Sequence, residues 1–298
     1  MTGKMHGVAV DAGSGLADSI RTARGPRAQP DDLVTFKRAV LETLGPGAST
    51  VLLDANCGPE LLSAYPEGCD RMLAFEADTY HISADDRITV LPENFTIHDY
   101  PDMGVKQLKF FMYYAPDDDP SLNAQKQDLV VDIGKKCREV GIRYLMEPLV
   151  YHPTVASGGP DYAALKPDLV RRATAVFADP RFQVDVLKVE IPVDLGYVEG
   201  FGTPQMSHAD ALDAFRAAAA EADGIDLVYL SAGVAFEWFE ASLKMAGDAG
   251  VDFAGFMCGR AIWSDGVDVF GAQGEKALRA WLADTGRTRL ARLIATLN

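Results

Sequence analysis

Short apolar stretches alternate with longer amphipathic ones along almost the whole chain. Eight runs are rich in β-branched, aliphatic or aromatic residues, and polar or glycine-containing turns follow them. Several of the segments between them carry apolar residues at the three- and four-residue spacing of an amphipathic helix. The runs cover residues 7–11, 50–56, 71–76, 107–114, 143–150, 184–192, 227–231 and 253–260, and the helical segments include residues 32–44, 121–140, 161–177, 208–222 and 236–249. Because strands this apolar cannot face water on one side, the alternation predicts a parallel α/β fold.

Two architectures fit this alternation over 298 residues: a closed (β/α)8 barrel and an open, doubly wound sheet. Polar or ionisable residues stand at the carboxyl ends of several predicted strands. In a barrel these ends meet on one rim around one cavity, whereas an open sheet would hold those of distant strands far apart. They are Asp11, Asp54, Glu147, Lys188, Glu190, Ser231 and Arg260. No linker or composition shift divides the chain, so we expect a single (β/α)8 TIM-barrel domain over residues 1–298.

The composition restricts the partners of such a barrel. Lys and Arg number 28 against 43 Asp and Glu, which gives a formal net charge of −15. A field of this sign repels polyanions, so nucleic acid and anionic membrane surfaces are poor partners. A small anionic substrate requires a few Lys or Arg side chains that converge locally.

The cysteine and histidine residues give no indication of a metal site. The four cysteines are scattered without a CxxC pair, and the five histidines include no HExxH motif. No secretory leader precedes the first strand-like run, and no stretch of 18 apolar residues occurs. We therefore expect a cytoplasmic protein with reduced cysteines, no metal ion and no membrane span.

Lys188 lies in the middle of the apolar run 184–192. Period-two alternation places it on the same face as Val184, Val186 and Glu190. A lysine in a buried strand is costly unless it is paired or deprotonated. Burial and a neighbouring cation both lower the pKa of an amine, which makes it a nucleophile able to form a Schiff base with a ketone. The alternative is an edge pair with Glu190 or a side chain that extends to solvent.

Three further residues at strand positions are candidates for the same site. Lys109, in the run 107–114, is either a second active-site amine or a surface lysine at the start of a strand, which the strand alone favours. Glu147 stands near the end of the fifth run, where a partly desolvated carboxyl group has a raised pKa and can shuttle protons. Pairing with a strand lysine is compatible with that role. Asp11 orients a lysine or a substrate hydroxyl, or it caps the next helix.

Two glycine-containing strand ends indicate a phosphate site. In a barrel the loops after the seventh and eighth strands commonly bind phosphate through backbone N–H groups and a helix N-terminus. Ser231, Ala232 and Gly233 follow the seventh run, and Gly259 and Arg260 end the eighth. The guanidinium of Arg260 supplies a positive charge of matching geometry.

The glycines after the first strand are a weak match to a dinucleotide-binding fingerprint. Gly13 and Gly15 form G-x-G, but Asp18 replaces the third small residue. The next strand ends at Asp54, too far along the chain to bind a ribose in the usual way. We therefore expect no nicotinamide cofactor.

The sequence resembles the class I tagatose-1,6-bisphosphate aldolase family, which includes the sulfofructosephosphate aldolases. The similarity runs from Val8 to about Leu297. The resemblance implies a (β/α)8 barrel without metal, in which Lys188 forms the imine with dihydroxyacetone phosphate and no other cofactor takes part. The similarity is densest in VLLD (51–54), LKFFMYY (108–114), NAQKQ (123–127), LMEPLVY (145–151), VDVLKVEIPV (184–193), YLSAGV (229–234) and GFMCGRAIW (255–263).

The resemblance also implies roles for other residues of the site. Glu147 matches the family's acid/base position, Lys109 its second active-site lysine, and Asp11 its first-strand aspartate. The positions that match the binding site for the ketone's phosphate are Ser231, Gly259 and Arg260. The resemblance further implies a homo-oligomer, a dimer or a larger assembly.

The first strand end departs from the family pattern. Family members typically continue Asp-Gln-Arg there, and this chain continues with Ala12, Gly13 and Ser14. The change removes a cation and an amide from the rim where the aldehyde half of the substrate would bind. A replacement is available only if arginines further along fold back toward the rim; the candidates are Arg21, Arg24 and Arg27.

These observations predict a class I aldolase that cleaves a ketose 1-phosphate or 1,6-bisphosphate, resembling tagatose 1,6-bisphosphate or 6-sulfofructose 1-phosphate, to dihydroxyacetone phosphate and an aldehyde. Lys188, Glu147, Lys109 and Asp11 are the expected catalytic residues, and Asp54 is expected to contact substrate with the phosphate-binding residues. One alternative is an epimerase or isomerase that acts through Glu147 and Asp54 without an imine, or a metal-dependent aldolase. Another is a barrel that binds sugar phosphates without turnover.

Overall fold

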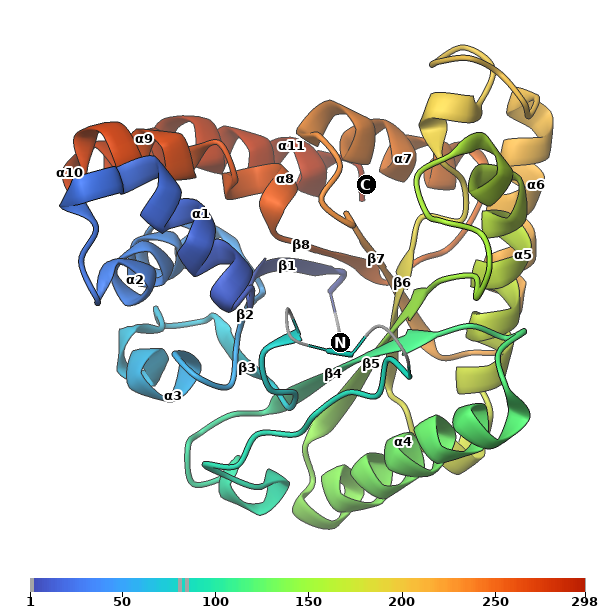
Figure 1. Ribbon diagram of the computed structural model, residues 1–298, viewed down its shortest axis with the longest axis horizontal. Helices are drawn as coiled ribbons and strands as arrows, with labels where there is room; N and C mark the ends of the chain where they lie inside the picture. Colours follow the sequence, from blue (N-terminus) through green and yellow to red (C-terminus); the bar gives the residue numbers. More distant parts are fainter. Residues whose placement is uncertain (1–2, 80–81, 84–85, 298) are drawn as a thin grey trace.

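Eight parallel strands form a closed barrel in chain order, each paired with the next and β8 with β1. The computed structural model describes residues 3–79, 82–83 and 86–297 (Figure 1). This is the (β/α)8 TIM barrel that the alternation predicted, and not the open sheet. The strands are β1 (Met5–Val10), β2 (Thr50–Leu53), β3 (Asp70–Ala74), β4 (Gln107–Tyr114), β5 (Arg143–Val150), β6 (Val186–Glu190), β7 (Asp226–Leu230) and β8 (Gly255–Cys258).

Helices surround this barrel and cover its outer face. The predicted helical segments are present with small changes of bounds. The helices are α1 (Ser14–Arg24), α2 (Asp32–Leu44), α3 (Gly58–Leu61), α4 (Pro120–Val140), α5 (Pro160–Phe177), α6 (His208–Ala220), α7 (Phe236–Asp248), α8 (Arg260–Trp263), α9 (Gly266–Gln273), α10 (Glu275–Trp281) and α11 (Arg287–Ala295). In Figure 1, α9 and α10 lie beside α1 and α2, so the end of the chain packs against its beginning.

The strand side chains separate into two apolar layers. The layer inside the barrel is small and includes Ala9, Leu52, Leu145, Val186 and Met257. The larger layer lies between the strands and the helices, and residues of the opposite parity fill it. Because successive side chains of a strand point to opposite faces, the parity of a residue decides whether it faces the barrel interior.

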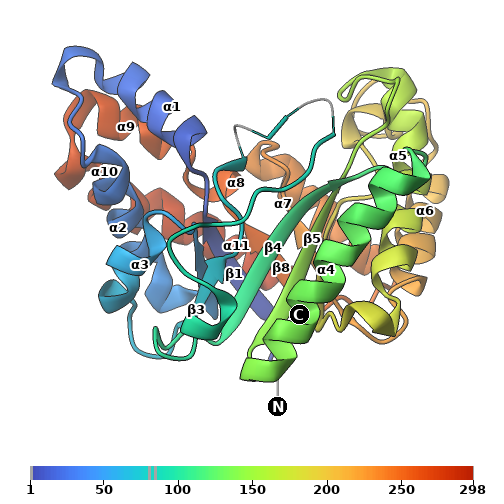
Figure 2. The same ribbon diagram turned by 60° about the horizontal axis from the view of Figure 1, so that its bottom comes forward.

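Both candidate lysines have the parity of the interior. Lys188 lies two residues after Val186 on β6, and Lys109 lies on β4 beside Ala74 of β3. All neighbouring strands are parallel, and Figure 2 shows the N-terminus, from which the chain enters β1, at the lower end of the barrel. The carboxyl ends of all eight strands therefore surround one opening, as the barrel architecture requires.

Candidate active site

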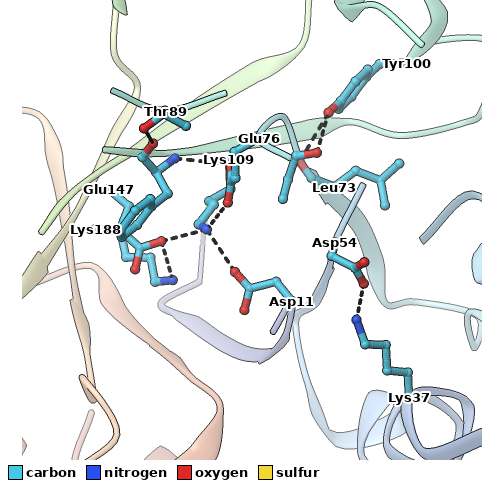
Figure 3. A network of polar contacts seen from close by, with 12 residues as sticks. Asp11, Lys37, Asp54, Leu73, Glu76, Thr89, Tyr100, Lys109, Glu147 and Lys188 are labelled. Carbon is cyan, nitrogen blue, oxygen red and sulfur yellow. Dashed lines mark hydrogen bonds and ion pairs between the residues drawn. The ribbon is translucent and has the colours of Figure 1, made fainter. Parts of the chain in front are cut away.

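Lys109 lies at the centre of a cluster of carboxylates inside the barrel (Figure 3). Its Nζ atom lies 2.9 Å from Oδ2 of Asp11 and 3.0 Å from Oε2 of Glu147, and it also contacts Oε1 of Glu76. Asp11 follows the last residue of β1, Glu147 lies within β5, and Glu76 follows the end of β3. The side chain of Lys109 is only 3% exposed. Lys109 is therefore not the surface lysine that the strand alone favoured.

Lys188 joins this cluster through Glu147. Its Nζ atom lies 2.9 Å from Oε2 of Glu147, the same oxygen that Lys109 contacts. The Lys188 side chain is 4% exposed, and Glu147 is its one hydrogen-bond partner among the described residues. The alternative edge pair with Glu190 is not formed, because Glu190 accepts from the backbone N–H of Val150 and pairs with Lys166. The structure thus brings together all four residues predicted to be catalytic.

Opposing effects set the charges of this cluster. Burial lowers the pKa of Lys109, but the carboxylates of Asp11, Glu147 and Glu76 outweigh burial and raise the pKa well above its usual value. Burial raises the pKa of Asp11, whereas Lys109 and Lys188 bring it well below its usual value. Lys109 is therefore a permanent cation and Asp11 a permanent anion at neutral pH.

Glu76 is the residue of the cluster that the sequence interpretation missed. Burial raises its pKa to about 7, although Lys109 acts in the opposite direction. Its second oxygen accepts a hydrogen bond from the backbone N–H of Phe111 at 3.2 Å. The signal was available, because Glu76 ends the third apolar run with the same parity as Ala74, which pairs with Lys109 across the sheet.

Asp54 does not reach the cluster. Its carboxylate accepts from the fully buried Nζ of Lys37 on α2 and from the backbone N–H groups of Asn56 and Cys57, at 3.2 and 3.1 Å. Figure 3 shows the pair apart from Lys109 and its partners. This ion pair anchors α2 to the end of β2, and because Asp54 also lines the cavity, the expected contact with substrate would compete with the pair.

The predicted phosphate residues converge at the ends of β7 and β8. Ala232 and Gly233 have φ angles of +48° and +79°, which turn the chain sharply after Ser231. A Cβ atom on Gly233 would lie 2.7 Å from Cζ of Arg260, and one on Gly259 would lie 2.5 Å from the carbonyl oxygen of Ala9. Both positions therefore require glycine. Among the described residues Arg260 has no ion-pair partner, so its guanidinium is available to an anion.

One cavity of about 1370 Å³ connects the lysine cluster with this corner. Lys188, Lys109, Glu147 and Asp11 line it together with Glu76. Asp54 and the residues predicted to bind phosphate lie along its wall as well: Ser231, Ala232, Gly233, Gly259 and Arg260. A small ligand in this cavity can therefore contact the amines and the phosphate corner at the same time.

The arginines after the first strand do not fold back into the cavity. Arg21 pairs with Asp18 at 2.6 Å and Arg24 with Asp32 at 2.6 Å. Arg27 donates to the backbone oxygen of Gly271 at 2.7 Å. None of the three lines the cavity, so the hypothesis that they replace the missing Gln-Arg is wrong.

A carboxylate occupies the start of α1. The backbone N–H of Ser14 donates to Asp78 at 2.7 Å, and a Cβ atom on Gly13 would lie 2.9 Å from the same carboxylate. A dinucleotide phosphate at this helix start would meet a negative charge. Within the described part of the chain, no group of three or more His, Cys, Asp or Glu residues is arranged to hold a metal ion.

The family model of the DeoC/LacD family aldolases matches residues 6–265. A tagatose 1,6-diphosphate aldolase of Listeria monocytogenes serotype 4b (strain CLIP80459) is 34% identical over 298 residues, which cover 99% of this chain and 88% of that protein. A protein of the same name from Lactococcus lactis subsp. lactis is 38% identical over 254 residues, covering 84% of this chain and 78% of the relative.

Solved aldolase structures have the same fold. A fructose-bisphosphate aldolase from Plasmodium falciparum superposes with a TM-score of 0.73 at 14% identity, over 100% of this chain and 91% of that one. An archaeal fructose-1,6-bisphosphate aldolase, with its catalytic lysine covalently bound to a carbinolamine intermediate, gives a TM-score of 0.61 at 14% identity, over 98% and 94%. At 14% sequence identity, these similarities show only that the barrel fold is shared.

The chain belongs to the DeoC/LacD aldolase family, and it is an enzyme of the carbon–carbon lyase class. The family resemblance seen in the strand motifs is thereby confirmed. Among the helices of the described residues, none has the length and apolar content to cross a membrane.

Proposed function

We propose that the protein is a class I aldolase that cleaves a ketose 1-phosphate or 1,6-bisphosphate to dihydroxyacetone phosphate and an aldehyde. The observation that carries the proposal is the position of Lys188, a buried amine 2.9 Å from a carboxylate oxygen that also contacts Lys109. The two lysines that contact Glu147 have different roles. Lys109 is held as a cation by three carboxylates, which leaves Lys188 as the nucleophile.

The proposed reaction starts when the neutral amine of Lys188 attacks C2 of the ketose. One proton moves from nitrogen to the C2 oxygen to give a carbinolamine, protonated Glu147 supplies a second proton to that oxygen, water leaves, and an iminium ion that keeps one proton on nitrogen forms. Loss of the proton from the C4 hydroxyl then allows the C3–C4 bond to break, and its electron pair moves into the iminium to give an enamine. The aldehyde leaves first. Protonation at C3 and hydrolysis release dihydroxyacetone phosphate and restore the amine.

Glu147 is placed to move these protons. Its Oε2 atom receives a hydrogen bond from the Lys188 amine, so it can accept the amine's proton and return it to the C2 oxygen. We propose that Glu147 also accepts the proton of the C4 hydroxyl. Lys109 and Asp11 would hold the substrate hydroxyls, because their charges are fixed and 2.9 Å apart.

The corner formed by Ser231, Gly233 and Arg260 would anchor the 1-phosphate. It lies at the ends of β7 and β8, next to the strand that carries Lys188. Arg260 provides the local positive charge that the net charge of −15 requires for an anionic substrate. Anchoring one end of the ketose there fixes its C2 carbonyl near the amine.

Reductive trapping tests the proposal. With a ketose 1-phosphate and borohydride, we expect a covalent adduct on Lys188 by peptide mass spectrometry, and turnover that persists in EDTA. Lys166 lines the same cavity and serves as the internal control, because it should remain unmodified. Normal turnover with an unmodified Lys188 would refute the imine, and sensitivity to EDTA without trapping would select a metal-dependent aldolase.

The variant Lys188→Met should abolish both trapping and cleavage. If instead it cleaved substrate at the normal rate, the imine proposal would be wrong. We expect this variant still to bind ketose phosphates with unchanged affinity. The alternative of a binding protein without turnover predicts no cleavage by the unmodified protein under any condition.

A further inference from the structure

The wall of the cavity formed by the start of α1 is acidic. Asp18 and Asp78 line it; Arg21 pairs with Asp18 at 2.6 Å but does not itself line the cavity, and Arg24 pairs with Asp32. Among the described residues that line this wall, none is a cation that could pair with a second anionic group on the substrate. A distal phosphate or sulfonate would need a cation on another part of the rim.

Arg87 supplies a cation on the rim formed by the ends of β4 and β5. Its Cζ atom lies 4.1 Å from the ring centroid of Tyr151 and 5.2 Å from that of Tyr113. All three side chains line the cavity. Stacking on aromatic rings holds a guanidinium in place and leaves its N–H groups free to donate. Among the described residues, Arg87 has no ion-pair partner.

The backbone around Arg87 is tied to the barrel. The hydroxyl of Thr89 donates to the backbone oxygen of Phe111 on β4 at 2.9 Å, and the N–H of Ala77 donates to the oxygen of Val90 at 2.7 Å. Figure 3 includes the Thr89 contact. Arg87 itself has a φ angle of +51°, a conformation that non-glycine residues seldom adopt. These contacts place the arginine above β4.

A column of side chains leads from the lysine cluster to Arg87. Lys109, Phe111 and Tyr113 follow one another on the inner face of β4. The Nζ atom of Lys109 lies 5.4 Å from the ring centroid of Phe111, and the Phe111 and Tyr113 rings are 4.9 Å apart. Arg87 extends this column toward the opening. If the C4 hydroxyl of the substrate contacts Lys109, C5 and C6 of the ketose extend along this column toward Arg87.

Other cations of the cavity have different partners. Lys109 is surrounded by three carboxylates, and Lys166 pairs with Glu190 at 3.5 Å. Arg260 lies at the proposed 1-phosphate corner. Lys126 adds positive charge behind Tyr151, 5.2 Å from its ring centroid, but it is buried and Asp118 bonds to the same Tyr151 hydroxyl. Arg87 is the free cation on the rim opposite Arg260 among the described residues that line the cavity.

On the basis of the proposed function, we propose that Arg87 binds an anionic group at the distal end of the aldehyde half of the substrate, a phosphate or a sulfonate. Arg87 is then a specificity-determining residue, with Tyr113 and Tyr151 as the aromatic support that positions it. The substrate class is a ketose 1-phosphate with a second anion at C6, held at both ends by guanidinium groups on opposite parts of the rim.

The test compares cleavage of three ketose 1-phosphates that carry a phosphate, a sulfonate or a hydroxyl at C6. The unmodified enzyme should prefer at least one of the two anionic substrates in kcat/KM. Arg87→Gln should lower kcat/KM for the preferred substrate about 10- to 100-fold, which corresponds to a lost hydrogen bond to a charged group. Cleavage of the C6-hydroxyl substrate should be unchanged, and Arg87→Lys should retain part of the preference.

Arg216→Gln is the matched control, since Arg216 pairs with Asp213 at 2.5 Å and does not line this cavity. It should leave all three rates unchanged. An equal loss for all substrates in Arg87→Gln, or no loss for any, would overturn the assignment of Arg87. If the unmodified enzyme cleaved the C6-hydroxyl substrate with the same kcat/KM as the two anionic substrates, the proposal that the substrate carries a second anion at C6 would be wrong. Absence of cleavage and of borohydride trapping with every substrate would instead contradict the proposed aldolase reaction itself.

Discussion

Lys188 and Lys109 share one oxygen atom of Glu147, at 2.9 and 3.0 Å from their respective Nζ atoms. The shared oxygen couples the two amines. A proton that leaves Lys188 can move to Glu147 without leaving the cluster, while Lys109 stabilises the resulting charges.

Glu147→Gln should slow the reaction without removing the nucleophile. An amide cannot accept the amine's proton, so we expect kcat to fall by about 10²- to 10⁴-fold, the usual effect of losing a general acid–base group. Adduct formation on Lys188 should become slow but remain detectable when borohydride is added after long incubation. Quenched-flow trapping measures this rate. A variant with normal kcat would show that another group moves the protons.

Glu76 makes stability depend on pH in a defined direction. Its pKa is about 7 in the folded protein and about 4.5 when it is unperturbed. Between these values the folded protein binds a proton that the unfolded chain has lost, so the contribution of Glu76 to the free energy of unfolding falls as the pH rises from about 4.5 to about 7. Over the whole window this amounts to about 3 kcal/mol.

Glu76→Gln should remove that slope. Urea unfolding at pH 5 and pH 8 measures this slope. The free energy of unfolding of the variant minus that of the unmodified protein should be more positive at pH 8 than at pH 5. Infrared difference spectra of the two proteins should also show a protonated carboxyl group that titrates with a midpoint near pH 7. If the difference in stability between the two proteins did not change with pH, the assignment of a pKa near neutrality to Glu76 would be wrong.

The phosphate corner should be sensitive to a single methyl group. Gly233→Ala places a Cβ atom 2.7 Å from Cζ of Arg260 and forces alanine to adopt a φ angle of +79°. We expect KM for a ketose 1-phosphate to rise by about 10-fold or more, as for Arg260→Gln, because a charge-assisted contact is lost. Gly68→Ala is the control, since Gly68 has a φ angle of +82° and no atom near its Cβ position. That variant should lose stability but keep its KM.

Asp54 should contribute to stability and not to chemistry. Asp54→Asn leaves the fully buried amine of Lys37 without a counter-charge, and breaking a buried ion pair costs about 3–5 kcal/mol. The urea midpoint should fall, while kcat/KM per folded molecule remains nearly constant. Lys106→Met, which breaks an exposed pair with Asp70, should change stability by less than about 1 kcal/mol. A loss of activity in Asp54→Asn at unchanged stability would restore its role in substrate binding.

The local pattern of the sequence was sufficient for several features of the site. The alternation of strands and helices, with the polar strand ends, predicted the barrel, and period-two parity placed Lys188 on the same face as Val186. Parity is a property of the strand backbone alone, so it can be read without knowledge of the neighbours. For the same reason the strand ends with Glu147, Asp11 and Arg260 could be assigned to one rim once the barrel was assumed.

Contacts between elements were decided by the tertiary structure. Asp54 ends a strand as Asp11 does, yet it turns to Lys37 on α2, because a buried amine there requires a counter-charge. Glu76 reaches Lys109 only because β3 pairs with β4 in one register. The conformation of Arg87 depends on a loop attached to β4 by Thr89. The sequence by itself determined the barrel and which residues of a strand share a face. Barrel closure and side-chain pairing decided which face is the interior and which charges meet, since ion pairs form between residues distant in the chain.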